Sequence, residues 1–217
     1  MVSAVRIVRT FLVLAGLALT GPAALAQAVT LTPYIGSFHS LASYADTHDD
    51  AGRRVTVDQV TAAVFGARVS LALNSTLSAE AAVGFSRSSV VLRIADSCVD
   101  INAELFDCST SVPGTVMTAS ARLLFNLGPR NLWGIAGGTY VRHSGNAWRD
   151  PSTSSRNDFG AVVGVGTHAG ITHRLALTFT AEASIYSFDP DGPNSLYEGR
   201  RQADLVVTVG VPISLSH

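Results

Sequence analysis

The sequence contains no lysine and few charged residues of any kind. All 15 basic residues are arginines, and charged residues make up 14% of the 217-residue chain, against about a quarter in an average soluble protein. A guanidinium group suits fixed, planar pairing rather than a loose, solvated charge. The net charge of −1 gives no indication of nucleic-acid binding, so we expect no nucleic acid among the partners.

The amino-terminal apolar run, residues 11–19, is too short to cross a membrane as a helix, which needs about 20 residues. It follows Arg6 and Arg9 and precedes Ala24-Leu25-Ala26, an arrangement typical of a secretory signal peptide. We therefore predict a cleaved signal peptide over residues 1–26, with a retained anchor as the alternative. The remaining domain, residues 27–217, has 13 of the 15 arginines against 16 acidic residues, a net charge of −3.

Cysteine is nearly absent, and the two that occur, Cys98 and Cys108, lie in one segment. In an exported protein, an even number of closely spaced cysteines indicates a disulfide bond. A metal site is less favoured because no histidine lies near the two thiols. We predict a bridge that staples a loop, and neither a metal ion nor a cofactor.

Residues 60–87 have the clearest pattern in the chain. Apolar side chains occupy every second position through residues 65–73 and again through residues 77–85, which is the period of a β-strand. Antiparallel pairing across the turn at residues 74–76 places Phe65 opposite Phe85 and Ser70 opposite Glu80, with Arg68 diagonal to Glu80. We predict a hairpin with one apolar face and one face of small residues and an ion pair.

The rest of the chain supplies six more strands with similar alternation, at residues 28–38, 115–125, 131–143, 159–169, 174–188 and 203–215. Their connections alternate in length: long polar loops at residues 39–56, 88–113, 144–157 and 189–201, and tight turns between the others. Consecutive strands joined in this way form an up-and-down barrel with all long loops at one end. The predicted fold is an all-β, eight-stranded antiparallel barrel.

Composition indicates which face of this barrel lies outside. The polar face consists of Gly, Ser, Thr and Ala, interrupted by four charged residues near mid-strand. It is too sparsely charged for a solvated exterior, whereas small residues fit the narrow lumen of an eight-stranded barrel. We therefore expect a transmembrane barrel with a lumen charge cluster of Arg68, Glu80, Arg122 and Glu182. The alternative is a soluble lipocalin-like carrier with the apolar face inward.

The aromatic residues of the apolar face fall at two levels. We expect one girdle toward the long loops and one near the tight turns, similar to the two aromatic girdles of transmembrane barrels. The predicted girdle residues are Phe65, Phe85 and Phe159 at the first level and Phe125 and Trp133 at the second.

With its signal peptide, strand count, loop alternation and segments such as LTPYIGSF and AVVGVG, the chain resembles the small eight-stranded outer-membrane barrels of the OmpA/OmpX type. The resemblance covers residues 28–215. It implies export through the periplasm of a Gram-negative bacterium into the outer membrane, contact with outer-membrane lipid and lipopolysaccharide, insertion by the barrel-insertion machinery, and a monomer. Such barrels usually end on an aromatic residue, whereas the residues after the last predicted strand are Leu215-Ser216-His217. We expect no peptidoglycan-binding domain after the eighth strand.

No motif in the sequence indicates catalysis. His39 and His143 are each followed by a serine, but adjacent strand residues point to opposite faces and cannot form a nucleophile and base. The His-x-Ser element of lipid A deacylase barrels is absent, and the aspartates near position 48 lack calcium-loop spacing. The remaining histidines considered are His48, His168, His173 and His217.

The sequence therefore favours a non-enzymatic outer-membrane barrel with a filled lumen, in a structural, adhesive or surface-interaction role. The alternatives are an outer-membrane enzyme that modifies lipid A or phospholipid, and the soluble secreted carrier. The sequence names no external ligand.

Overall fold

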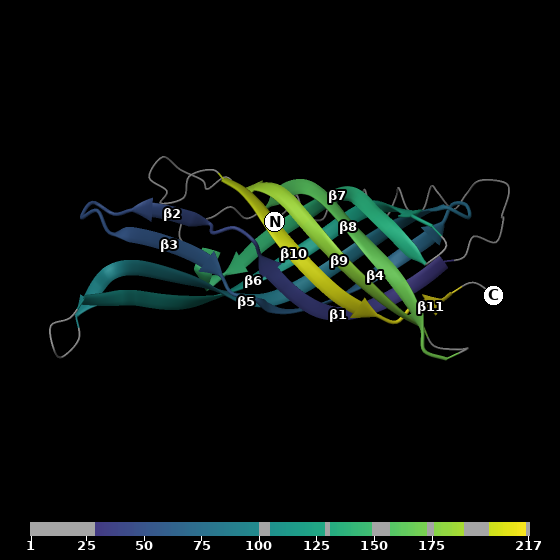
Figure 1. Cartoon of the computed structure of the whole chain (residues 1–217), viewed down its shortest axis with the longest axis horizontal. Coiled ribbons are helices and arrows are strands. Elements are labelled where there is room, and N and C mark those ends of the chain that lie inside the picture. Colours follow the sequence, from purple (N-terminus) through teal and green to yellow (C-terminus); the bar gives the residue numbers. More distant parts are fainter. Residues whose placement is uncertain are drawn as a thin grey trace.

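The structure is a computed structural model that describes residues 29–99, 105–128, 131–148, 157–172, 176–188 and 200–215 (Figure 1). The described chain is almost entirely β-strand, which confirms the all-β class. Its elements are β1 (Val29–Ser40), β2 (Ala45–His48), β3 (Arg54–Gln59), β4 (Ala62–Ala72), β5 (Leu77–Val99), β6 (Leu105–Asn126), β7 (Leu132–Gly145), the 3-10 helix η1 (Asn146–Trp148), β8 (Asp158–Gly170), β9 (Ala176–Phe188), β10 (Arg200–Gly210) and β11 (Ile213–Ser214).

Several predictions from the sequence concern other parts of the chain. The signal peptide at residues 1–26, most of the loops 144–157 and 189–201, and the histidines at positions 173 and 217 lie outside the described residues. No helix in the described ranges has the length and apolar character needed to cross a membrane.

Eight strands form a closed antiparallel ring. Strands β4 to β10 pair in chain order, and β1 closes the ring by pairing with both β10 and β4. The hairpin of β4 and β5 has the expected register, with Phe65 opposite Phe85 and Ser70 opposite Glu80. The predicted up-and-down barrel is therefore confirmed. We call the end with the tight turns the turn end and the opposite end the mouth.

The bulky apolar side chains of most strands lie on the outside of this ring. Phe65 is 57% exposed and Phe159 is 69% exposed, whereas the charged residues at mid-strand are buried. The inward positions are filled by small residues and hydroxyls, because eight strands leave little width for more. This arrangement is the predicted one, and it is the reverse of a soluble carrier with an apolar lumen.

The prediction of a long loop over residues 88–113 is wrong. Strands β5 and β6 continue far past the barrel and stay paired as far as Ile94 opposite Cys108 and, after a bulge, Cys98 opposite Phe106. The predicted loop 39–56 also contains strands, since β2 pairs with β3 and β3 pairs with β5. These strands form a sheet in the order β6, β5, β3, β2 that projects beyond the mouth (Figure 1). We call the sheet of β2, β3, residues 88–99 and residues 105–113 the arm.

The outer hairpin of the arm is closed by a short charged turn. Asp49 accepts hydrogen bonds from the Arg53 side chain and from the backbone N–H groups of Ala51 and Arg53. The hydrogen bonds from Arg53 hold the pKa of the Asp49 carboxyl below its ordinary value. Gly52 has a φ of 76°, a left-handed conformation that glycine adopts without strain. The turn therefore has a defined shape although it is exposed.

The Cys98–Cys108 disulfide, predicted from the sequence, joins β5 to β6 near the far end of the arm. Replacing both cysteines by serine removes a constraint on a loop with a sequence separation of 10, which stabilises by up to about 3 kcal/mol. The loss should be confined to the arm, because the barrel strands lie far from the bridge. We expect faster proteolytic cleavage within the distal arm, mapped by mass spectrometry, at an unchanged urea midpoint of the barrel. A large fall in that midpoint would contradict this assignment.

The face of β7 that contains Trp133 was predicted to lie outward, but it lies inward. Trp133, assigned from the sequence to the lower aromatic girdle, is only 8% exposed and lies inside the barrel at the turn end. Its ring lies 4.2 Å from the His168 ring, and a side chain at Gly166 would collide with the indole. The prediction failed because β7 is apolar or small on both faces, so its alternation does not decide its orientation. The register fixes it, since Arg122 points inward and lies opposite Gly137.

Candidate functional site in the barrel lumen and mouth

The four charged residues predicted for the lumen come from four different strands and meet near the middle of the barrel. Arg68 is on β4, Glu80 on β5, Arg122 on β6 and Glu182 on β9. Arg122 Nη2 lies 2.6 Å from Glu80 Oε1, and Arg122 Nη1 donates to Glu182 Oε2. Arg68 Nη2 lies 2.9 Å from Glu182 Oε1. The cluster is therefore a chain of alternating charge with no net charge, and Arg122 is its central link.

The pairing inside this cluster differs from the one expected within the hairpin. The sequence placed Arg68 diagonal to Glu80, but the structure pairs Arg68 with Glu182 and Glu80 with Arg122. Glu80 and Arg122 lie directly opposite each other on the neighbouring strands β5 and β6, whereas Arg68 on β4 and Glu182 on β9 meet across the lumen. Closure of the ring brings β4 and β9 together, so the hairpin of β4 and β5 alone does not reveal the partner of Arg68.

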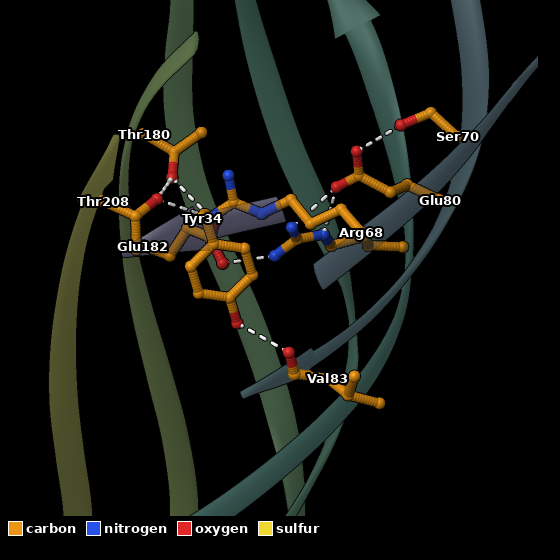
Figure 2. A network of polar contacts seen from close by, with 9 residues as sticks. Tyr34, Arg68, Ser70, Glu80, Val83, Thr180, Glu182 and Thr208 are labelled. Carbon is orange, nitrogen blue, oxygen red and sulfur yellow. Dashed lines mark hydrogen bonds and ion pairs between the residues drawn. The ribbon is translucent and has the colours of Figure 1, made fainter. Parts of the chain in front are cut away.

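Neutral groups complete the surroundings of the two ends of the cluster (Figure 2). Arg68 Nη2 donates to the hydroxyls of Thr180 at 2.8 Å and Thr208 at 2.7 Å. Its guanidinium also lies 4.2 Å from the centre of the Tyr34 ring, a favourable cation–π contact. At the other end, the Ser70 hydroxyl donates to Glu80 at 2.5 Å. Arg68 and Glu80 therefore each contact both an oppositely charged partner and at least one neutral hydroxyl group.

Glycines make room for these large side chains. A Cβ atom at Gly66 would lie 2.5 Å from the Tyr34 ring, and one at Gly137 would lie 2.6 Å from Arg122. The two glycines therefore occupy positions where any side chain would collide with Tyr34 or Arg122. Beside the cluster the described side chains leave a hollow of about 30 Å³, enough for one or two water molecules. The middle of the lumen is filled.

A second buried polar cluster closes the mouth. Tyr44, just before β2, folds over the barrel opening and is fully buried. Its ring packs edge-on against Phe188, with 4.9 Å between ring centres, and its hydroxyl donates to Gln59 Oε1 at 2.6 Å. The same hydroxyl lies 3.1 Å from His143 Nε2 and 3.4 Å from the Tyr186 hydroxyl. Tyr44 thus ties the base of the arm to the inside of the barrel.

The mouth cluster continues to two carboxylates. The Tyr186 hydroxyl donates to Asp204 Oδ2 at 2.7 Å, and His143 Nδ1 lies 3.5 Å from Asp158 Oδ2. All of these side chains are buried among Phe38, Val116, Val141 and Phe188. The sequence assigned no role to this cluster. The signal that could have found it is that polar residues occupy inward positions at the mouth ends of β7, β9 and β10.

Both histidines that precede a serine in the sequence contact other groups. Within the described residues, His143 is buried beside Asp158 and Tyr44, and the hydroxyl of Ser144 is 2.6 Å from that of Thr115. His39 contacts Thr61 and Ser37 rather than Ser40. Across the described residues there is no group of three or more His, Cys, Asp or Glu side chains suited to a metal ion.

The other predicted site residues lie on the surface or at the turn end. The outward aromatics near the mouth form pairs: the ring centres of Phe65 and Phe85 are 5.2 Å apart, and Phe159 lies 5.1 Å from Tyr140, which the sequence analysis did not assign to the girdle. Phe125 is exposed near the turn end. His48 is exposed at the end of β2, and His168 contacts the Thr178 hydroxyl at 3.0 Å.

Solved structures share this architecture. The chain is similar to the outer membrane protein OprG from Pseudomonas aeruginosa, with a TM-score of 0.50 and 11% identity over 86% of this chain and 93% of that one. It is also similar to the outer membrane protein AlkL, studied in lipid bilayers, with a TM-score of 0.52 and 12% identity over 88% of this chain and 92% of that one. This chain has the fold of a small outer-membrane β-barrel. No protein-family model and no curated protein matches the sequence.

This likeness supports the predicted outer-membrane location and does not assign the chain to the OmpA/OmpX type in particular. The outward apolar side chains of the barrel face lipid, and the filled lumen needs no solvent. In such barrels the chain termini lie on the periplasmic side and the long loops outside the cell. If this barrel has the same orientation, we expect the arm to project from the cell surface.

The inward position of Trp133 can be tested with lipids that carry bromine on their acyl chains. Bromine quenches indole fluorescence only at short range, so an indole behind the barrel wall is protected. In a Trp148→Phe background, we expect Trp133 to be quenched several-fold less than a tryptophan placed outward by Phe159→Trp in a protein lacking both native tryptophans. Equal quenching of the two would place Trp133 in the lipid girdle after all.

Proposed function

We propose that this protein is a non-enzymatic outer-membrane barrel whose arm is a binding surface beyond the membrane, in an adhesive or surface-interaction role. The observation that carries the proposal is the combination of a closed lumen with a large projecting sheet. A barrel filled by ion pairs and capped by Tyr44 offers no wide path for solutes, whereas the arm offers a rigid, exposed surface. The proposal includes a monomer inserted by the barrel-insertion machinery.

The arm has two features of a recognition surface. Leu105 is 62% exposed and Phe106 is 50% exposed at its far end, where large apolar side chains facing water mark interaction sites. Among the described strands, residues 105–113 of β6 pair with β5 alone, because pairing of β6 with β7 begins at Gly114. An edge without a strand partner can pair with an added strand of a partner protein.

The experiment compares attachment of cells that express the full-length protein with attachment of cells that express a Leu105→Ser, Phe106→Ser variant. We expect the variant to lose the additional attachment to abiotic or host-cell surfaces that the unaltered protein confers. The matched control is Leu41→Ser, which changes an equally exposed leucine near the base of the arm. An unchanged attachment of the double variant, at equal surface amounts, would refute an adhesive role of the tip.

The alternatives make different demands on the structure. A lipid-modifying enzyme needs a nucleophile and a base at one accessible place, and the described histidines that meet a hydroxyl do so in structural contacts, at Thr61, Tyr44 and Thr178. A soluble carrier needs an apolar cavity, but the middle of the lumen holds four buried charges. Lipid extracts that show no modified species upon expression would support the non-enzymatic proposal.

A further inference from the structure

An open hollow of about 400 Å³ lies on the outside of the barrel where the arm leaves it. Its lining includes Arg87, Pro113, Gly114, Thr115 and Gly145. The hollow exists because the last pair between β6 and β7 is Gly114 opposite Gly145, and Pro113 has no N–H group to continue the ladder. Gly145 is exposed and, with a φ of 105°, turns the chain away into η1.

Two outward arginines flank this part of the wall. Arg87 on β5 and Arg142 on β7 are both exposed, and β6 runs between their strands. Among the described residues, no carboxylate forms an ion pair with either guanidinium, although all four arginines and glutamates of the lumen are paired. In a chain with so few charges, two outward arginines without an ion pair among the described residues are available to bind an anion from outside the protein.

The height of the two arginines indicates which partner. Arg87 lies two residues toward the mouth from Phe85, and Arg142 lies two residues toward the mouth from Tyr140. Phe85 and Tyr140 belong to the outward aromatic pairs near the mouth, and girdles of aromatic residues flank the lipid-facing band of transmembrane barrels. One pleat above such a girdle is the level of the lipid headgroups. At that level in the outer leaflet, the abundant anions are phosphate groups on glycolipid.

Hydroxyl groups complete the surface between the arginines. Thr115 lies opposite both Arg87 and Ser144 in the register, and Met117 in the next row lies opposite Arg142. The Oγ atoms of Thr115 and Ser144 are 2.6 Å apart. From strand spacing and rise, the Cα atoms of the two arginines are separated by about 12 Å. This is the span of a headgroup with two anionic ends rather than of one small ion.

We propose that Arg87 and Arg142 bind the phosphate groups of a bis-phosphorylated glycolipid of the lipopolysaccharide type. Each guanidinium can hold a phosphate by two parallel hydrogen bonds, the hydroxyls of Thr115 and Ser144 face the sugar, and the open hollow beside Gly145 gives the headgroup room. The acyl chains then lie against the apolar wall below Phe85 and Met117. This site is separate from the arm tip, so it stands or fails independently of the adhesive role.

The test measures binding of diphosphoryl lipid A to the full-length purified protein in nanodiscs of uncharged phospholipid. We expect an Arg87→Gln, Arg142→Gln variant to bind about tenfold or more weakly, since two charge-assisted contacts are lost. The matched control, Arg93→Gln with Arg201→Gln, removes two exposed arginines elsewhere and should bind within about twofold of the unaltered protein. An Arg87→Lys, Arg142→Lys variant should recover part of the affinity, because charge remains without the planar fork.

Three outcomes would overturn the proposal. Unchanged binding by the double glutamine variant would show that the arginines do not hold the headgroup. An equal loss in the control variant would show attraction to net charge without a site. Equal binding of lipid A and its dephosphorylated form would show that the phosphate groups are not recognised, and full displacement of lipid A by millimolar inorganic phosphate would show a free-phosphate site rather than a lipid site. Heat-modifiable gel migration establishes beforehand that every variant is folded.

Discussion

Replacement of Arg122 by methionine is expected to destabilise the barrel by about 3–5 kcal/mol. Arg122 is 4% exposed and contacts both glutamates of the lumen. Without it, Glu80 keeps only the Ser70 hydroxyl and Glu182 keeps only Arg68, so one negative charge is left uncompensated in a water-poor interior. Urea unfolding of the protein in lipid vesicles, followed by Trp133 fluorescence, measures the change.

A second substitution separates loss of packing from loss of charge balance. In the variant Glu80→Gln, Arg122→Met the remaining pair of Arg68 and Glu182 is neutral, and no carboxylate of the lumen charge cluster lacks a cation. We expect this double variant to regain most of the stability that the single variant loses, because neutral replacements for both members of a buried pair are often tolerated. If the double variant is as unstable as Arg122→Met alone, charge compensation is not what Arg122 supplies.

The barrel and the lumen residues could be predicted because strand period and membrane constraints act on every residue. Side chains alternate across each strand, so Arg68 and Glu80 must share a face once Ser70 is opposite Glu80. A charge on the lipid face would be costly, which leaves the lumen as the place for mid-strand charges. The contacts of Glu182 with Arg68 and Arg122 depend on how the ring closes, and no local pattern contains that information. The pair of Glu80 with Arg122 depends on the register between β5 and β6.

The sequence did not predict the arm, because its polar and acidic residues are typical of a loop. Residues 90–94 alternate between Val90, Leu92 and Ile94 on one face and Val91 and Arg93 on the other, which is a strand pattern that continues from β5 without interruption. The cysteines and the acidic residues of the same segment predicted a loop instead. The length of β5 is set by its pairing with β3 and β6 and not by membrane thickness. A strand predicted from the expected membrane span therefore ends too early.

The mouth cluster could not have been found from local pattern alone. Tyr44 lies in a polar segment, and its hydroxyl approaches that of Tyr186, which is 142 residues away in the chain. What the sequence does contain is the set of inward polar positions near the mouth, His143, Asp158 and Asp204. Buried polar groups require partners, so their presence indicates that some further residue must cover them. Only the fold shows that this residue is Tyr44.

Replacement of Tyr44 by alanine is expected to cost about 3–5 kcal/mol, the usual loss for a fully buried aromatic ring. The ring fills the mouth against Phe188, and its hydroxyl contacts Gln59 and His143. Tyr44→Phe keeps the ring and loses only the hydroxyl contacts, at about 1–3 kcal/mol. Urea unfolding in vesicles measures both changes, and equal losses for the two variants would mean that ring packing contributes little.

Conductance of Tyr44→Ala in planar bilayers shows whether Tyr44 or the lumen charge cluster blocks the passage of solutes. Removal of Tyr44 opens the mouth, but Arg68, Arg122 and the two glutamates still fill the lumen below it. Tyr44→Ala should therefore lose stability without gaining channel activity. Stable channel openings in this variant alone would show that the ion-pair cluster does not seal the barrel and that Tyr44 is the gate of a solute path.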